Sequence, residues 1–172
     1  MDLVWRGLFD SAELSALHAA GFGGAATPRD WWHQVNHHSL GWVTARAENP
    51  APPENPTPAG IPAPPENPSP DGIPATAGNP TSAGIPATAG NPALAGFVNV
   101  AWDGGEHAFV LDTLVAPAAQ RTGLGTALVH AAIDGARRAG CAWLHVDFED
   151  HLAEFYREAC GFRGTAAGVL RL

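Results

Sequence analysis

The chain has 172 residues, and its nine basic side chains, all of them arginine, stand against seventeen acidic ones for a formal net charge of −8. A chain of this length can enclose a core without disulfides, and its acidic balance argues against broad nucleic-acid binding and favours cationic acceptors. No segment approaches the length of a membrane span, and the N-terminus lacks a leader pattern. We therefore expect a single cytoplasmic domain over residues 1–172, monomeric or homodimeric, with no nucleic-acid and no membrane partner.

The N-terminal segment predicts a short strand followed by a capped helix. Residues Leu3–Arg6 are suited to a first strand. Asp10 offers an N-cap and Glu13 a carboxylate three residues later, a combination typical of a helix start. The helix is expected to run to about Ala20 and to end at Gly21.

A second helix and a second strand are expected next. Thr27-Pro28 places proline at a first helical position and predicts a helix to about His38, and Leu40–Arg46 alternates as a strand does. His33 and His37 are four residues apart and would share a helix face. Because no third ligand of suitable type stands nearby, no metal site is expected.

A twelve-residue unit occurs four times from Ala51 to Val98, as APPENPTPAGIP, APPENPSPDGIP, ATAGNPTSAGIP and ATAGNPALAGFV. Proline at this density is incompatible with helices and with the interior of a sheet. We therefore expect residues 51–92 to form a largely disordered loop insertion between the second and third strands. A solvent-exposed expansion explains such a segment, and the alternative is a spacer or a ligand for a proline-recognising partner.

The end of the fourth copy continues into a predicted hairpin. Leu94–Trp102 is an apolar strand, and Asp103–Gly105 is a turn signal that joins it to the next strand. That strand includes Phe109–Val115 and ends before Pro117, because proline donates no hydrogen bond to a sheet.

A glycine-rich turn then opens a long predicted helix. Gln120-Arg121-Thr122-Gly123-Leu124-Gly125 precedes apolar residues at helical spacing, and Gly140 suits a left-handed cap. The first amides of a helix bind anions such as pyrophosphate, and glycine allows a ligand to approach the backbone closely. Triphosphate-binding loops require a lysine, which this chain lacks, and dinucleotide loops require a small residue where Leu128 stands.

The remainder of the chain predicts a strand, a helix and short terminal strands. Ala142–Phe148 alternates between apolar and polar side chains. A helix is expected from about Asp150 to Cys160, ending at Gly161, and Phe162–Leu172 predicts one or two short strands.

The segment from Gln120 to Gly125 resembles the Gln/Arg-x-x-Gly-x-Gly/Ala signature of the GNAT superfamily of acyl-CoA-dependent N-acyltransferases. Leu114–Pro117 is similar to that family's strand-to-loop lead-in, and Phe155-Tyr156 followed by Cys160-Gly161-Phe162 resembles its Phe-Tyr…Gly-Phe helix end. The resemblance implies an α/β fold of the GNAT type, a mixed central sheet flanked by helices. It also implies transfer of an acetyl group from acetyl-CoA, the co-substrate, to a primary amine of a small molecule or protein.

The resemblance further implies roles for particular residues. The pyrophosphate of CoA would lie on the amides of Arg121 to Gly125, and a main-chain amide of Leu114 or Val115 would face the thioester oxygen. Tyr156, the only tyrosine, matches the family's general acid and would protonate the departing thiolate. The cofactor-binding residues expected in this way are Leu114, Val115, Gln120, Arg121, Thr122, Gly123, Leu124, Gly125 and Thr126.

The general base is less closely defined by the sequence. Asp112 is the first candidate, because it interrupts an apolar strand and period-two alternation puts it on the same face as Leu114. Glu149, Asp147 and His145 are alternatives, acting directly or through water. Glu149 also departs from the family pattern, in which asparagine often stands at this distance before the Phe-Tyr pair. An interpretation from another class is a CoA-binding regulatory or scaffold module without turnover, which presents its repeats to a partner.

Overall fold

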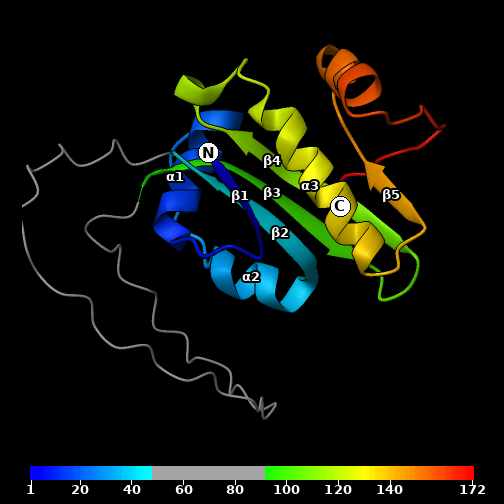
Figure 1. The fold of residues 1–172 in the computed structure, drawn as a ribbon, viewed down its shortest axis with the longest axis horizontal. Coiled ribbons are helices and arrows are strands. Elements are labelled where there is room, and N and C mark those ends of the chain that lie inside the picture. The colour runs from blue at the N-terminus through cyan, green and yellow to red at the C-terminus, as the bar shows by residue number, and fades with distance from the viewer. Residues whose placement is uncertain (48–91) are drawn as a thin grey trace, which may run out of the picture.

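A five-stranded sheet in the order β1-β2-β3-β4-β5 is the centre of the fold. We describe it from a computed structural model that covers residues 1–47 and 92–172 (Figure 1). The first four strands are antiparallel neighbours, and β5 is parallel to β4, so the sheet is mixed as expected. The insertion predicted over residues 51–92 lies outside the described residues, apart from Pro92. The strands are β1 (Asp2–Trp5), β2 (Ser39–Arg46), β3 (Leu94–Trp102), β4 (His107–Val115) and β5 (Trp143–Val146).

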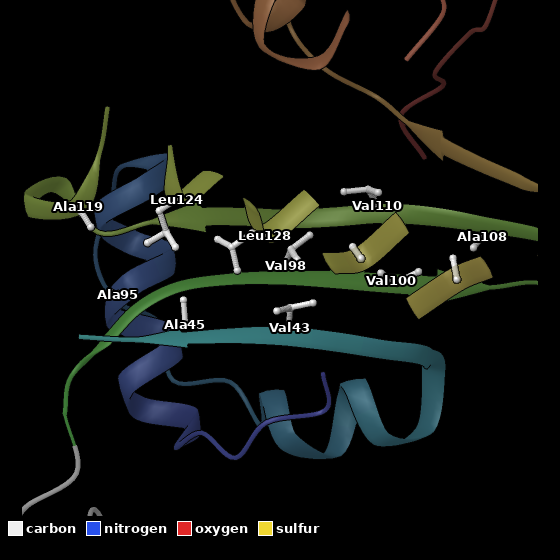
Figure 2. Packing of buried hydrophobic residues seen from close by; sticks show 12 residues of the cluster. Val43, Ala45, Ala95, Val98, Val100, Ala108, Val110, Ala119, Leu124 and Leu128 are labelled. Atoms are coloured by element: carbon white, nitrogen blue, oxygen red, sulfur yellow. The ribbon is translucent and has the colours of Figure 1, made fainter. Parts of the chain in front are cut away.

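Helices cover both faces of this sheet. Helix α3 (Leu124–Arg138) packs on one face, where Leu128, Val98 and Val110 belong to one buried cluster, shown in Figure 2. Helices α1 (Ser11–Phe22) and α2 (Trp31–His38) pack on the other face. In the parts of the chain that the structure describes, none of the helices combines the length and the hydropathy needed to cross a bilayer.

The helix boundaries correct two of the sequence predictions. Asp10 does cap α1, by accepting hydrogen bonds from the amides of Ala12 and Glu13, but the helix continues past Gly21 to Phe22. Its end is at Gly23, which takes a left-handed φ of 78°. Helix α2 does not start at Thr27-Pro28, because the side chain of Asp30 caps it by accepting from His33 N.

Strand β4 contains a bulge at its centre. Phe97 pairs with Leu114 and Asn99 pairs with Leu111, so two residues of β4, Asp112 and Thr113, lie opposite the single residue between them on β3. Asp112 has a φ of 50°, a left-handed conformation that Asp tolerates better than most residues do. The bulge changes which side chains face each layer of helices.

The C-terminal part is less regular than the sequence predicts. Strand β5 is shorter than the expected Ala142–Phe148. The helix expected from about Asp150 to Cys160 is present, but it begins as a 3₁₀ turn, η2 (Asp150–Leu152), and continues without a break into a π-helical turn, η3 (Phe155–Ala159). Residues 162–172 form none of the expected short strands, and the side chains after Phe162 are exposed. Without packing against the core, the alternation of a few residues does not produce a strand.

An ion pair holds α1 across the ends of β2 and β3. The Glu13 carboxylate meets the Arg46 guanidinium through two contacts of 3.0 Å, and it also accepts a hydrogen bond of 2.7 Å from Leu94 N. Arg46 donates further to the carbonyls of Leu8 and Pro92. The pair therefore ties α1 to the last residue of β2 and to the first residue of β3.

We expect Glu13→Gln to lower the free energy of unfolding by about 1–3 kcal/mol, because it removes a partly buried, charge-assisted interaction. Urea unfolding of the full chain measures the difference. Asp134→Asn is the matched control, since its ion pair with Arg137 is largely exposed and should be worth less than about 0.5 kcal/mol. Equal costs for the two variants would contradict the role given to the Glu13 pair.

Candidate active site

Beyond the bulge, β4 pairs with β3 but no longer with β5. Pairing between β4 and β5 stops at Val110 and Val146, whereas β4 continues to Val115 and keeps its pairing with β3. Figure 1 shows β5 leading away from β4 toward the last helical segment. The backbone of Asp112 to Val115 is therefore left without a partner strand on that edge, where its amides and carbonyls can bind a ligand.

The N-terminus of α3 lies beside this edge. Gly123 is its N-cap, with a φ of 85° and no side chain to satisfy the first amides of the helix. Arg121, two residues earlier, is exposed and has a φ of 61°. A Cβ on Gly125 would lie 3.3 Å from Phe155 and 3.6 Å from Val115, so α3, β4 and η3 converge at this glycine.

Two polar side chains of the predicted loop support its conformation. Thr122 donates from Oγ1 to the carbonyl of Ala119, at 2.7 Å, and Gln120 donates from Nε2 to the carbonyl of Val115, at 3.3 Å. Ala119 ends a 3₁₀ turn, η1 (Pro117–Ala119), that leads from β4 into the loop. The loop is therefore fixed to the end of β4 and presents the first amides of α3 outward.

Tyr156 lies in η3 on the α3 side of β4. It is buried, and its ring stacks on Phe148 with centroids 5.0 Å apart and meets Phe155 edge-on at 4.8 Å. Burial raises the pKa of the Tyr156 phenol, and the nearby Thr113 hydroxyl partly opposes that rise. Thr113 Oγ1 is itself buried and makes no hydrogen bond of acceptable geometry with any described residue.

Asp112 and Leu114 both face α1, on the other side of β4. Leu114 belongs to the cluster of α1 and α2, and Asp112 Oδ1 lies 3.8 Å from Nε2 of His18, a residue of α1. Asn99 is on the same face, two residues from Phe97, and its side-chain oxygen is a buried acceptor without a partner among the described residues. A carboxylate, an imidazole and an unpaired amide oxygen therefore stand on one face of the sheet.

The structure does not bring the other base candidates to this place. His145 lies 2.8 Å from His107 and stacks on Phe109, near the start of β4. Glu149 is exposed and pairs with His151 at 3.3 Å. Asp147 is exposed too.

The histidines of α2 stack on the surface of the helix. The rings of His33 and His37 are 4.0 Å apart, and His37 Nδ1 donates to the carbonyl of His33. Over residues 1–47 and 92–172, no three His, Cys, Asp or Glu side chains gather in a way that could hold a metal ion.

Comparison with known families identifies the fold. The model of the acetyltransferase (GNAT) family matches residues 58–162. The chain belongs to the GNAT family. No curated protein matches it.

Solved structures agree with this assignment of the fold. A Trypanosoma brucei acetyltransferase superposes with a TM-score of 0.57 at 19% identity, over 99% of both chains. A GNAT family protein of Streptococcus pneumoniae gives 0.59 at 16%, over 99% of this chain and 96% of that one. A probable acetyltransferase of Staphylococcus aureus gives 0.61 at 13%, over 99% and 98%. The expected GNAT fold is thereby confirmed.

A partial match is to glucosamine-6-phosphate N-acetyltransferase from Arabidopsis thaliana, with 20% identity and a TM-score of 0.42. It covers 46% of this chain and 57% of that one.

His18, which the structure places beside Asp112, was not singled out by the sequence analysis. It stands in the predicted first helix, four residues after the apolar Leu14, and a lone histidine there carries no motif. Its proximity to Asp112 depends on how α1 crosses β4, which the sequence pattern does not specify. Only the packing of the two elements identifies it.

The single tyrosine allows a direct test of the Tyr156 environment. Because burial raises its pKa, the absorbance of the phenolate in the native protein should titrate above the ordinary value of about 10, and in guanidinium chloride at about 10. A native midpoint at or below 10 would contradict the buried phenol. By linkage, the contribution of Tyr156 to stability is complete below about pH 10 and is lost as pH rises through the native pKa, so Tyr156→Phe should lose less stability over that window.

Proposed function

We propose that this chain is an N-acetyltransferase that moves an acetyl group from acetyl-CoA to a primary amine of a small molecule or protein. The observation that carries the proposal is the convergence at Gly125. There the bare N-terminus of α3, the unpaired end of β4 and the helical turn of Tyr156 come within contact distance. Membership of the GNAT family supports acetyl transfer as the reaction.

The pyrophosphate of CoA is proposed to bind at the start of α3. The amides there have no partner in their own helix and carry the positive end of its dipole. Gly123 and Gly125 leave the backbone accessible, and Arg121 adds an exposed positive charge. The residues proposed to hold the cofactor here are Gln120, Arg121, Thr122, Gly123, Leu124, Gly125 and Thr126.

The unpaired edge of β4 is proposed to hold the acyl arm, with Leu114 and Val115 as its contacts. The amide of Ala116 donates to the carbonyl of Ala95 on β3. Because successive backbone groups of a strand alternate in direction, the Val115 amide points away from β3, toward the free edge. Of the two amides considered from the sequence, Val115 is therefore the proposed donor to the thioester oxygen, and bound acetyl-CoA would supply the activated acetyl group.

The remaining steps require an acid and a base, and the two candidates, Tyr156 and Asp112, lie on opposite faces of β4. Tyr156 is proposed to donate its proton to the leaving thiolate, and its raised pKa keeps it protonated at neutral pH. Asp112 is proposed as the base on the acceptor side, where its negative charge favours a cationic amine. An alkylamine with a pKa near 10.4 is protonated at neutral pH and must lose a proton before it can attack.

The first prediction concerns the anion site. Calorimetric titration with acetyl-CoA should give micromolar binding by the wild-type chain, and Arg121→Glu should weaken it at least tenfold by placing a negative charge beside the pyrophosphate. Arg138→Glu makes the same charge change at the far end of α3 and should leave the affinity within about twofold. Absence of binding by a folded wild-type protein would refute the proposed function.

The second prediction concerns the acid. Tyr156→Phe should lower kcat for thiol release by about 100-fold or more, the usual contribution of a general acid, with acetyl-CoA affinity unchanged. An unchanged kcat would remove Tyr156 from the mechanism. Tight acetyl-CoA binding without thiol release from any primary amine would instead favour a CoA-binding regulatory or scaffold module.

A further inference from the structure

Helix α1 crosses β4 directly over the bulge, and His18 stands at the crossing. A Cβ on Gly21 would lie 2.9 Å from Leu114 Cδ2, so the absence of a side chain lets α1 approach the strand closely. His18 is three residues before Gly21, and Asp112 is two residues before Leu114. The close packing of α1 on β4 at Gly21 and Leu114 therefore brings the imidazole and the carboxylate together.

Two aromatic rings lie against the His18 imidazole. The ring of Phe22 lies 4.8 Å from it and the ring of Trp31 lies 5.1 Å from it, each measured between centroids. Trp31 is buried, and its indole nitrogen donates to Ser15 Oγ at 3.0 Å. Ser15 in turn donates to the carbonyl of Ser11 at 2.8 Å. The buried hydrogen bond from Trp31 to Ser15 joins α2 to α1 and holds the Trp31 ring beside His18.

The His18–Asp112 pair is placed to receive a third polar group. The side chains are 34% and 21% exposed, and neither nitrogen of His18 makes a hydrogen bond with a residue in the described part of the chain. The separation of 3.8 Å between Nε2 and Oδ1 is too long for a hydrogen bond. Both atoms can, however, accept hydrogen bonds of about 2.9 Å from one nitrogen between them.

We propose that His18 Nε2 and Asp112 Oδ1 together bind the ammonium group of the acceptor and that His18 takes its proton. This inference rests on the proposed function and refines one part of it: His18 accepts the proton that was assigned above to Asp112, and the Asp112 carboxylate stabilises the imidazolium that forms. The ligand is a primary ammonium with an apolar or aromatic substituent, because Phe22 is 62% exposed beside the pair. A further charged group near this wall is Arg29, whose guanidinium lies over the Trp31 ring at 4.7 Å.

The protons balance in this scheme. The ammonium gives one proton to neutral His18, and the Asp112 carboxylate stabilises the resulting imidazolium. The free amine attacks the thioester carbon, and the carbon–sulfur bond breaks. Tyr156 protonates the departing thiolate, and the second proton of the attacking nitrogen restores the Tyr156 phenol. His18 releases its proton to water, so each turnover yields an amide, a thiol and one proton.

The test uses phenethylammonium as the ligand and 2-phenylethanol as a neutral control with a hydroxyl in place of the ammonium. In NMR spectra of the full chain, phenethylammonium should shift the His18 imidazole signal saturably, whereas 2-phenylethanol should not. Asp112→Asn should abolish the shift while keeping the fold, because Asn tolerates the left-handed backbone of this position. His130→Gln, on the exposed surface of α3, should leave it unchanged.

The kinetic arm measures thiol release from acetyl-CoA with phenethylamine. His18→Gln should lower kcat/KM by about 100-fold, with acetyl-CoA affinity unchanged. The loss should be much smaller in the Asp112→Asn background, because the two residues act together. A missing His18 shift, or a wild-type kcat/KM in His18→Gln, would overturn the inference. If acetyl-CoA still binds, such a result leaves the proposed function standing, whereas failure to bind acetyl-CoA refutes that function itself.

Discussion

The bulge in β4 is the constraint on which the rest of the site depends. Before it, Ala108 and Val110 face α3; after it, Leu114 faces α1 and α2. Strict alternation from Val110 would have put Leu114 on the α3 side, so the extra residue exchanges the two faces. Asp112 provides the left-handed conformation that this requires. As a result, Asp112 and Leu114 lie on one side of the strand, and Thr113 lies near Tyr156 on the other.

The position of α1 has two supports, one at each end of the helix. The Glu13–Arg46 pair fixes its first turn to β2 and β3. Near its last turn, Gly21 allows the backbone to approach Leu114. A glycine inside a helix usually costs about 1 kcal/mol relative to alanine, and here it permits the close packing that sets His18 above Asp112. Gly21, at which the sequence analysis ended this helix, is thus a residue through which α1 packs against β4.

Much of the architecture could be predicted from local patterns, and the failures have physical reasons. The hairpin of β3 and β4 and the start of α3 follow from alternation and from the glycine-rich turn, and both were predicted closely. The start of α2 was wrong because Asp30 caps it in preference to Thr27-Pro28. The bulge and the approach of His18 depend on strand register and helix packing. These are long-range properties that residue periodicity does not report.

The two faces of β4 differ in polarity and exposure to water. This difference suits the proton donation that we propose for one face and the proton removal that we propose for the other. On one face, the Tyr156 phenol is surrounded by Phe148, Phe155 and Phe162, an environment of low polarity in which a hydrogen bond to a developing thiolate is strong. On the other, Asp112 and His18 are partly open to water, so a proton taken from an ammonium can leave. Among residues 1–47 and 92–172, each face also holds a buried polar atom without a hydrogen-bond partner, Thr113 Oγ1 on one and Asn99 Oδ1 on the other. Buried polar groups without partners are costly in a folded protein, and these two atoms, one on β3 and one on β4, lie beside the bulge on the two faces where we propose that the reactants bind.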